Sequence, residues 1–181
     1  LAFRDITVHS ESGGGHCVVT TVNSSQMVFS RFVFKNDNAN KSLWHQPLGY
    51  LGNITWEQFR LIPNSTSTLT AHPVNIESDQ IFNAWHVKDG RCEKGLGTLQ
   101  TFNLNTSNAS SFNTNSIFEN ITFQEPYSGW FKLGGCRSFE LKNCASYDQT
   151  TTQTGHGIQI GTSAGGQISS RIKISHCGRY P

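Results

Sequence analysis

Short stretches of alternating apolar and polar residues recur along the chain, separated by turns rich in Gly, Asn and Ser. A unit of a polar residue, an apolar residue, Thr and an apolar residue occurs at 5–8, 53–56 and 120–123, with a looser copy at 31–34. Alternation with a period of two is typical of β-strands, because successive side chains point to opposite faces. Helical periodicity is hardly visible anywhere. The pattern therefore predicts an all-β protein built from short strands.

Two longer segments match more closely. FELKNCASY at 139–147 and IKISHCGRY at 172–180 share their apolar alternation, and both contain a cysteine (Cys144, Cys177) and a tyrosine at the same positions. Repeats of this length that supply only short strands suit a solenoid, in which each coil buries its apolar side chains against the next coil. We therefore expect a single-stranded parallel β-helix with Cys144 and Cys177 stacked on neighbouring coils.

The turn residues divide the chain into expected coils. The expected strands are 5–10, 16–20, 26–30, 120–124, 129–133, 138–142, 144–147, 157–161 and 171–175. The interval 36–116 is expected to hold longer insertions, and 98–116, almost all Thr, Asn and Ser, is interpreted as a polar loop insertion. The whole of 1–181 is taken as one β-helix domain that is a piece of a longer chain.

Composition narrows the classes of partner. Charged residues make up only 14% of the chain, the net charge is +2, and no Lys/Arg run occurs, which argues against binding to nucleic acid. No segment approaches the roughly 20 apolar residues that a membrane-spanning helix needs. The five cysteines lack CxxC or Cys/His spacing, so we expect free thiols and neither a structural metal nor a cofactor.

One window concentrates the ionisable side chains of this charge-poor chain. It comprises Asp79, His86, Lys88, Asp89, Arg91 and Glu93. Three interpretations stay open: two carboxylates form a hydrolytic pair, His86 with Lys88 or Arg91 abstracts a proton and neutralises a uronate, or the window holds ordinary surface ion pairs. On the first two interpretations these six residues are catalytic.

Flat aromatic rings could stack on sugars beside such a site. Trp85 lies within the window, Trp44 adjoins polar residues that favour exposure, and Tyr127 lies in an expected turn. We therefore take these three as candidate substrate-binding residues. Trp56 and Trp130 fit alternating strand positions and are expected inside or at a coil edge.

The segment GHGIQIG at 155–161 and the tripeptide Arg171-Ile172-Lys173 carry a resemblance to a known family. With the coil rhythm, they resemble the pectin-lyase-like superfamily of right-handed parallel β-helices, which includes polygalacturonases, pectate lyases and phage tailspike depolymerases. The resemblance implies that His156 supports catalysis and substrate binding, and that Arg171 and Lys173 bind a substrate carboxylate. The Asn-Thr-Asp and Asp-Asp elements of the polygalacturonases are missing, so we interpret 155–161 mainly as a strand entered through a glycine turn.

The sequence thus leads to an expected function. We expect recognition and cleavage of a polysaccharide, a bacterial surface glycan or a uronate-containing polymer, by a β-helix of the phage tailspike type. This implies a virion tail appendage or another extracellular location, and the tailspike comparison implies a homotrimer. The alternatives are a non-catalytic glycan-binding or structural β-helix and a secreted pectin-degrading enzyme.

Overall fold

The computed structural model describes most of the chain. The described residues are 1–20, 23–47, 50–76, 82–93, 99–105, 113–124, 129–147, 157–161 and 166–180. They form strands, turns and bends, and none of them is helical. Within these ranges, accordingly, there is no helix of the length and apolar character that crossing a membrane requires.

The strands form two parallel sheets. The spine of the long sheet runs β1 (Ala2–Arg4), β4 (Ser24–Asn36), β6 (Leu51–Ile62), β8 (Phe82–Cys92), β10 (Asn113–Gln124), β12 (Cys136–Lys142) and β15 (Ser170–Ser175). Three further strands join it: β2 (Thr7–Ser10) beside β4, β13 (Ala145–Tyr147) beside β10, and β16 (Gly178–Tyr180) beside β13. The short sheet runs β3 (Val18–Val19), β5 (Trp44–Gln46), β7 (Val74–Ile76), β9 (Phe102–Asn105), β11 (Phe131–Gly134) and β14 (Ile158–Gly161).

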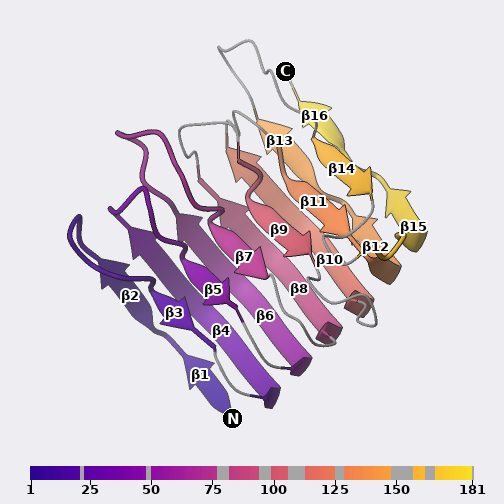
Figure 1. Ribbon diagram of the computed structural model, residues 1–181, viewed down its shortest axis with the longest axis horizontal. Coiled ribbons are helices and arrows are strands. Elements are labelled where there is room, and N and C mark those ends of the chain that lie inside the picture. Colours follow the sequence, from indigo (N-terminus) through magenta and orange to yellow (C-terminus); the bar gives the residue numbers. More distant parts are fainter. Residues whose placement is uncertain are drawn as a thin grey trace.

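The chain alternates between the sheets as it advances. From β4 it crosses to β5, returns to β6, crosses to β7 and continues in this way to the C-terminal strands, so neighbours in each sheet are one coil apart. In Figure 1 the long sheet lies behind, with its strands pointing up the picture, and the short sheet lies in front with its strands pointing down. Because each coil also advances from the N-terminal to the C-terminal side, the helix is right-handed. The expected all-β, right-handed parallel β-helix is confirmed.

The long strands change direction at residues with positive φ, all between 50° and 55°. The first bend row consists of Gln26, Asn53, Ala84, Asn115, Ser138 and Arg171. The second bend row consists of Asp5, Arg31, Gln58, Asp89, Asn120, Asn143 and His176. The left-handed region is costly for most residues but tolerated by Asn and Asp, which explains why polar residues recur at these points.

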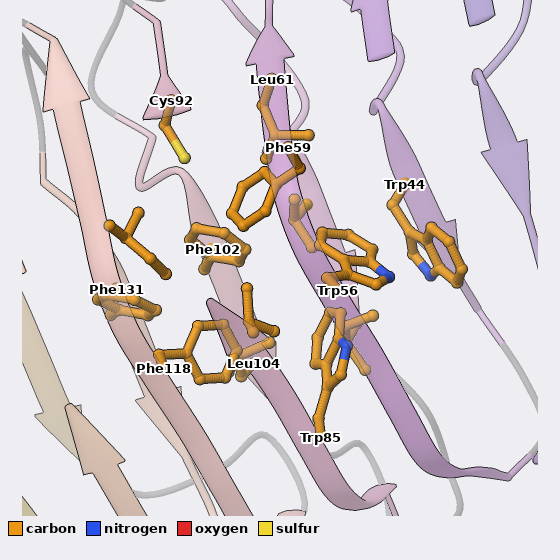
Figure 2. Close-up of a cluster of buried hydrophobic side chains, with 14 of the residues drawn as sticks. Trp44, Trp56, Phe59, Leu61, Trp85, Cys92, Phe102, Leu104, Phe118 and Phe131 are labelled. Carbon is orange, nitrogen blue, oxygen red and sulfur yellow. The ribbon is translucent and has the colours of Figure 1, made fainter. Parts of the chain in front are cut away.

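The core lies between the two sheets. Along β8, Trp85 and Val87 point inward and are buried, whereas His86 and Lys88, which alternate with them, point outward. Figure 2 shows the inward aromatic rings converging, with Trp56 and Trp85 in edge-to-face contact at 4.8 Å between ring centroids. Burial of this apolar surface holds successive coils together.

The repeats seen in the sequence correspond to structural rows. Phe139 lies opposite Ile172 and Tyr147 opposite Tyr180, so the match of 139–147 with 172–180 is confirmed. The units at 5–8, 31–34 and 120–123 begin at the second bend row, and 53–56 begins at the first. All four units therefore correspond to the same local structure, in which a polar residue at a bend is followed by an inward apolar residue.

The interval 98–116 differs from the polar loop that its composition predicted. Its described part contains β9 and the start of β10, and residues 106–112 lie outside the described ranges. Phe102 and Leu104 point into the core and are fully buried, so this polar stretch supplies two apolar side chains, two positions apart, to a strand that pairs with β7 and β11. The wider interval 36–116 likewise contains β5 to β9 with the same coil rhythm.

Candidate functional site

The outer surface of the long sheet, between the two bend rows, carries a ladder of opposite charges. His86 Nε2 lies 2.8 Å from Glu119 Oε1, and Lys142 Nζ lies 3.5 Å from Glu119 Oε2. Lys88 Nζ lies 3.4 Å from Glu57 Oε2. These five residues, the charge ladder, come from four neighbouring strands, so each pair links two coils. Opposite charges facing each other across strands stabilise the sheet modestly.

Glu119 is the most strongly engaged carboxylate of the charge ladder. The hydrogen bond from His86 lowers the pKa of Glu119, and Coulombic attraction from His86 and Lys142 acts in the same direction against partial burial. Glu119 is therefore ionised at neutral pH. In this state it can accept a proton or hold a cation, but it cannot serve as a general acid.

The other described polar residues of the predicted catalytic window also bridge coils. Asp89 accepts a hydrogen bond from Asn120 Nδ2 at 2.9 Å, and Arg91 Nη2 donates to Gln124 Oε1 at 2.6 Å. Glu93 accepts from the Arg60 guanidinium. All the described members of the window thus lie on the outer face, as ion pairs or hydrogen-bonded pairs.

Asp79 of the same window lies outside the described residues, as do Tyr127 and His156.

The predicted sugar platforms Trp44 and Trp85 require correction. Both indole rings have 0% exposed surface, Trp44 against Phe29 and Trp85 against Trp56, so neither can stack on a sugar. Of the polar residues next to Trp44, His45 faces the other side of the strand, whereas Gln46 is itself buried on the same side as Trp44. Polar neighbours were therefore no guide to the exposure of the indole ring. The predicted interior positions of Trp56 and Trp130 are confirmed.

A groove follows the first bend row near the C-terminal strands. It consists of two adjoining hollows of about 360 and 370 Å³, which share Asn115, Ser138 and Arg171. These three are consecutive members of the first bend row, on β10, β12 and β15. We call this feature the bend groove. Further residues that line it are Thr114, Ile117, Arg137, Phe139, Glu140, Ser170 and Lys173.

The bend groove is rich in positive charge. The described lining residues include three basic side chains, Arg137, Arg171 and Lys173, and one acidic side chain, Glu140. Lys173 Nζ already lies 2.8 Å from Glu140 Oε1. The exposed Arg171 side chain forms no hydrogen bond or ion pair with any described residue.

Arg31 makes a useful contrast, because it occupies the second bend row on another coil. Its Nε and Nη2 atoms each donate to Asp5 at 2.6 Å, one to each carboxylate oxygen. Arg171 is a bend arginine of the first row, and its neighbour in that row on the preceding strand is Ser138, where Arg31 has Asp5.

This arrangement suits an anionic ligand with sugar-like polarity. A guanidinium group can bind a carboxylate, sulfate or phosphate through two parallel hydrogen bonds. Asn115 and Ser138 add amide and hydroxyl groups that can bind sugar hydroxyls. Ile117, 38% exposed, offers an apolar patch beside them. Among the described residues, no group of three or more His, Cys, Asp or Glu side chains could hold a metal ion.

Sequence reasoning found part of this groove. The resemblance pointed to Arg171 and Lys173, and both face outward on β15 as members of the groove. Asn115 and Ser138 were missed, although aligning 139–147 with 172–180 and stepping back one residue places Ser138 beside Arg171. Glu119 was missed because its partner His86 is 33 residues away in the sequence.

No protein-family model matches the sequence, and neither the search of curated proteins nor the search of solved structures found a significant match.

Proposed function

We propose that this protein recognises an acidic polysaccharide, and that the bend groove is the binding site. The observation that carries the proposal is Arg171, an exposed guanidinium without a carboxylate partner among the described residues, which lines both hollows of the bend groove, one with Arg137 and the other with Lys173. A carboxylate of the ligand, as in a uronate, would accept from Arg171 the two parallel hydrogen bonds that Asp5 accepts from Arg31.

The shape of the groove supports a polymer as ligand. Its floor crosses three strands, which spans roughly 10 Å at about 4.8 Å per strand. Polar groups of the first bend row repeat along this line, and so match a ligand whose units also repeat. The surface is open at the sides, so an extended chain can enter and leave without threading.

The resemblance to the pectin-lyase-like superfamily adds a second line of support. It implies that the Arg171 and Lys173 pair binds a substrate carboxylate, and the two side chains share the outer face of β15 and one hollow. Membership of that superfamily and a location on a virion tail appendage or elsewhere outside the cell belong to the same proposal.

Recognition is better supported than hydrolysis. A glycosidase needs a protonated carboxyl group as its acid, which requires a raised pKa at neutral pH. The described carboxyl groups with a shifted pKa are Asp5, Asp37 and Glu119, and each is lowered by a hydrogen bond from a basic side chain. The proposal is therefore binding, and the binding experiment also measures whether the polymer is cleaved.

The test is a panel of polysaccharides that includes uronate-containing, sulfated and neutral polymers, with binding measured at two salt concentrations. We expect uronate-containing polymers to bind, neutral ones not to bind, and affinity to fall at high salt because exposed charges are screened. Arg171→Ala should weaken binding by about tenfold or more, since a hydrogen bond to a charged group contributes about 1.5–3 kcal/mol.

Arg31→Ala is the matched control. It removes a bend arginine whose guanidinium group already donates to Asp5, so this variant should bind the polymer like the wild type. The proposal fails if no acidic polymer binds, or if Arg171→Ala binds as tightly as the wild type. The same incubations are read for reducing ends and for the absorbance of unsaturated uronates. Product with this absorbance would add a lyase activity, and product without it a hydrolase activity.

A further inference from the structure

A tyrosine ring lies on the outer surface of the long sheet, beside the first bend row on β6. The residue that precedes this bend is Gly52, and a Cβ atom added there would lie 2.5 Å from Cζ of Tyr50 and 2.6 Å from its Cε1. The ring of Tyr50 therefore occupies the place of a side chain at position 52. The corresponding residue of β12, Arg137, is exposed, so this place is on the outside of the sheet.

Tyr50 is held in position and remains accessible. Its backbone N–H donates to Asn23 Oδ1 at 2.9 Å, the tip of its ring lies against Gly52, and the residue is partly exposed. Its hydroxyl group forms no hydrogen bond with any described residue. A tyrosine ring offers apolar contact area at a low cost in conformational entropy, and the C–H groups of a sugar ring can pack on it.

The polar groups next to Tyr50 are amides. Asn53 follows Gly52 in the first bend row, and Gln26 is its neighbour on β4. Both residues are exposed, and neither side chain forms a hydrogen bond with a described residue. An amide donates from its nitrogen and accepts at its oxygen, so it suits the hydroxyl groups of a neutral sugar. We call Tyr50, Asn53 and Gln26 the tyrosine subsite.

The first bend row changes from neutral to basic between β10 and β12. On β4, β6, β8 and β10, no Lys, Arg, Asp or Glu occurs at the bend residue or the residue before it, which are the described positions 25–26, 52–53, 83–84 and 114–115. On β12 and β15 the same positions include Arg137 and Arg171. The tyrosine subsite and the bend groove thus lie on one row, and they differ in charge.

The two sites are far enough apart to need a polymer. From Asn53 to Arg171 the first bend row crosses five strands of the long sheet, which is roughly 19 Å at about 4.8 Å per spacing. This length is several times the width of one sugar ring. Ala84, the bend residue of β8, has only a methyl group, so no long side chain of this row blocks the path between Asn53 and Asn115.

We infer that the tyrosine subsite binds a neutral sugar of the same polymer whose acidic sugar is bound by Arg171. The inference rests on the proposed function and adds the class of polymer: a heteropolysaccharide in which neutral sugars separate the uronates. A polymer that is charged at every sugar would place carboxylates over the tyrosine subsite. The described positions of the first bend row on β4 to β10 offer no basic side chain to pair with them.

The first experiment compares three polymers by their affinity for the wild-type protein. Every sugar of polygalacturonate is charged, whereas neutral sugars separate the uronates in hyaluronan and in gellan. We expect at least one of these two heteropolymers to bind more tightly than polygalacturonate. Polygalacturonate binding as tightly as either heteropolymer would overturn the inference.

The second experiment measures variants with the heteropolymer that binds more tightly. Tyr50→Ala should weaken binding about three- to tenfold, and Tyr50→Phe should retain most of the affinity because the ring remains. Gly52→Ala keeps the tyrosine and displaces its ring, so it should weaken binding as well. Tyr147→Ala is the matched control, because it removes an exposed tyrosine beyond the second bend row, and it should bind like the wild type. Circular dichroism confirms that each variant is folded.

Salt separates the two sites. The loss of affinity in Tyr50→Ala should be the same at low and high salt, since packing on a ring is not screened, whereas the loss in Arg171→Ala should shrink as salt rises. If Arg171→Ala weakens binding and neither Tyr50→Ala nor Gly52→Ala does, the inference is wrong and the proposed function stands. If no acidic polymer binds at all, the proposed function itself fails and the inference falls with it.

Discussion

Gly90 provides a sharp test of how the coils pack, because its inward position is filled by a neighbour. Gly90 follows Asp89 of the second bend row and lies opposite Phe59 on one side and Ile121 on the other. A Cβ atom added at Gly90 would lie 2.0 Å from Phe59 Cζ and 2.1 Å from its Cε1. The ring of Phe59 thus occupies the space that a side chain at position 90 would need.

Phe59 cannot move freely out of the way. It is 4% exposed, its ring stacks on Phe32 at 5.6 Å, and its edge meets Trp56 at 5.7 Å. Overpacking a core costs about 1–3 kcal/mol, and contacts this short indicate the upper part of that range. Replacing Gly by Ala in a strand returns about 0.5–1 kcal/mol of backbone entropy. We therefore expect Gly90→Ala to lower the free energy of unfolding by about 2 kcal/mol.

The assay is urea unfolding followed by tryptophan fluorescence. Gly161→Ala is the matched control, because a Cβ there meets no atom within 4 Å, and it should change stability by less than about 0.5 kcal/mol. Combining Gly90→Ala with Phe59→Leu should cost less than the sum of the two single changes, since the smaller side chain leaves room. If Gly90→Ala is as stable as the wild type, the reasoning is refuted.

Three further predictions concern single side chains. Thiol titration of the unfolded, unreduced protein should find five reactive thiols, because Cys144 and Cys177 stack as free cysteines; a count of three would contradict this. Burial lowers the pKa of His16 below its ordinary 6.5, so the folded state binds fewer protons, and stability measured by urea unfolding should fall as pH drops through 6.5. His16→Asn should flatten this dependence, and an unchanged slope would speak against it. His86→Ala should raise the pKa of Glu119 in an NMR titration, whereas an unchanged value would show that His86 does not hold the carboxylate.

The fold could be predicted from the sequence because the repeats reflect structural requirements that recur once per coil. The second bend row needs a polar residue that tolerates positive φ and then an inward apolar residue, and both Asp5-Ile6 and Asn120-Ile121 satisfy this. The register of Cys144 with Cys177 followed directly from the matched segments.

The candidate site was harder to predict. Whether an indole faces in or out depends on the phase of a three-residue strand, which is too short to show alternation, and Trp44 in β5 was assigned to the wrong side. Pairs such as His86 with Glu119 depend on the number of residues per coil, and small differences in turn length shift that number. The bend groove forms where Asn115, Ser138 and Arg171 lie side by side on neighbouring strands, so it becomes visible only in the folded chain.

The most direct measurement is a map of backbone amide shifts by NMR while a uronate oligosaccharide is added to the isotope-labelled protein. The second bend row serves as an internal reference for the first, because both rows present polar residues at positive φ on the same sheet. We predict shifts concentrated at Asn115, Ser138 and Arg171, with the second bend row unchanged. Shifts centred on the charge ladder around His86, or no saturable shifts at any concentration, would contradict recognition in the bend groove.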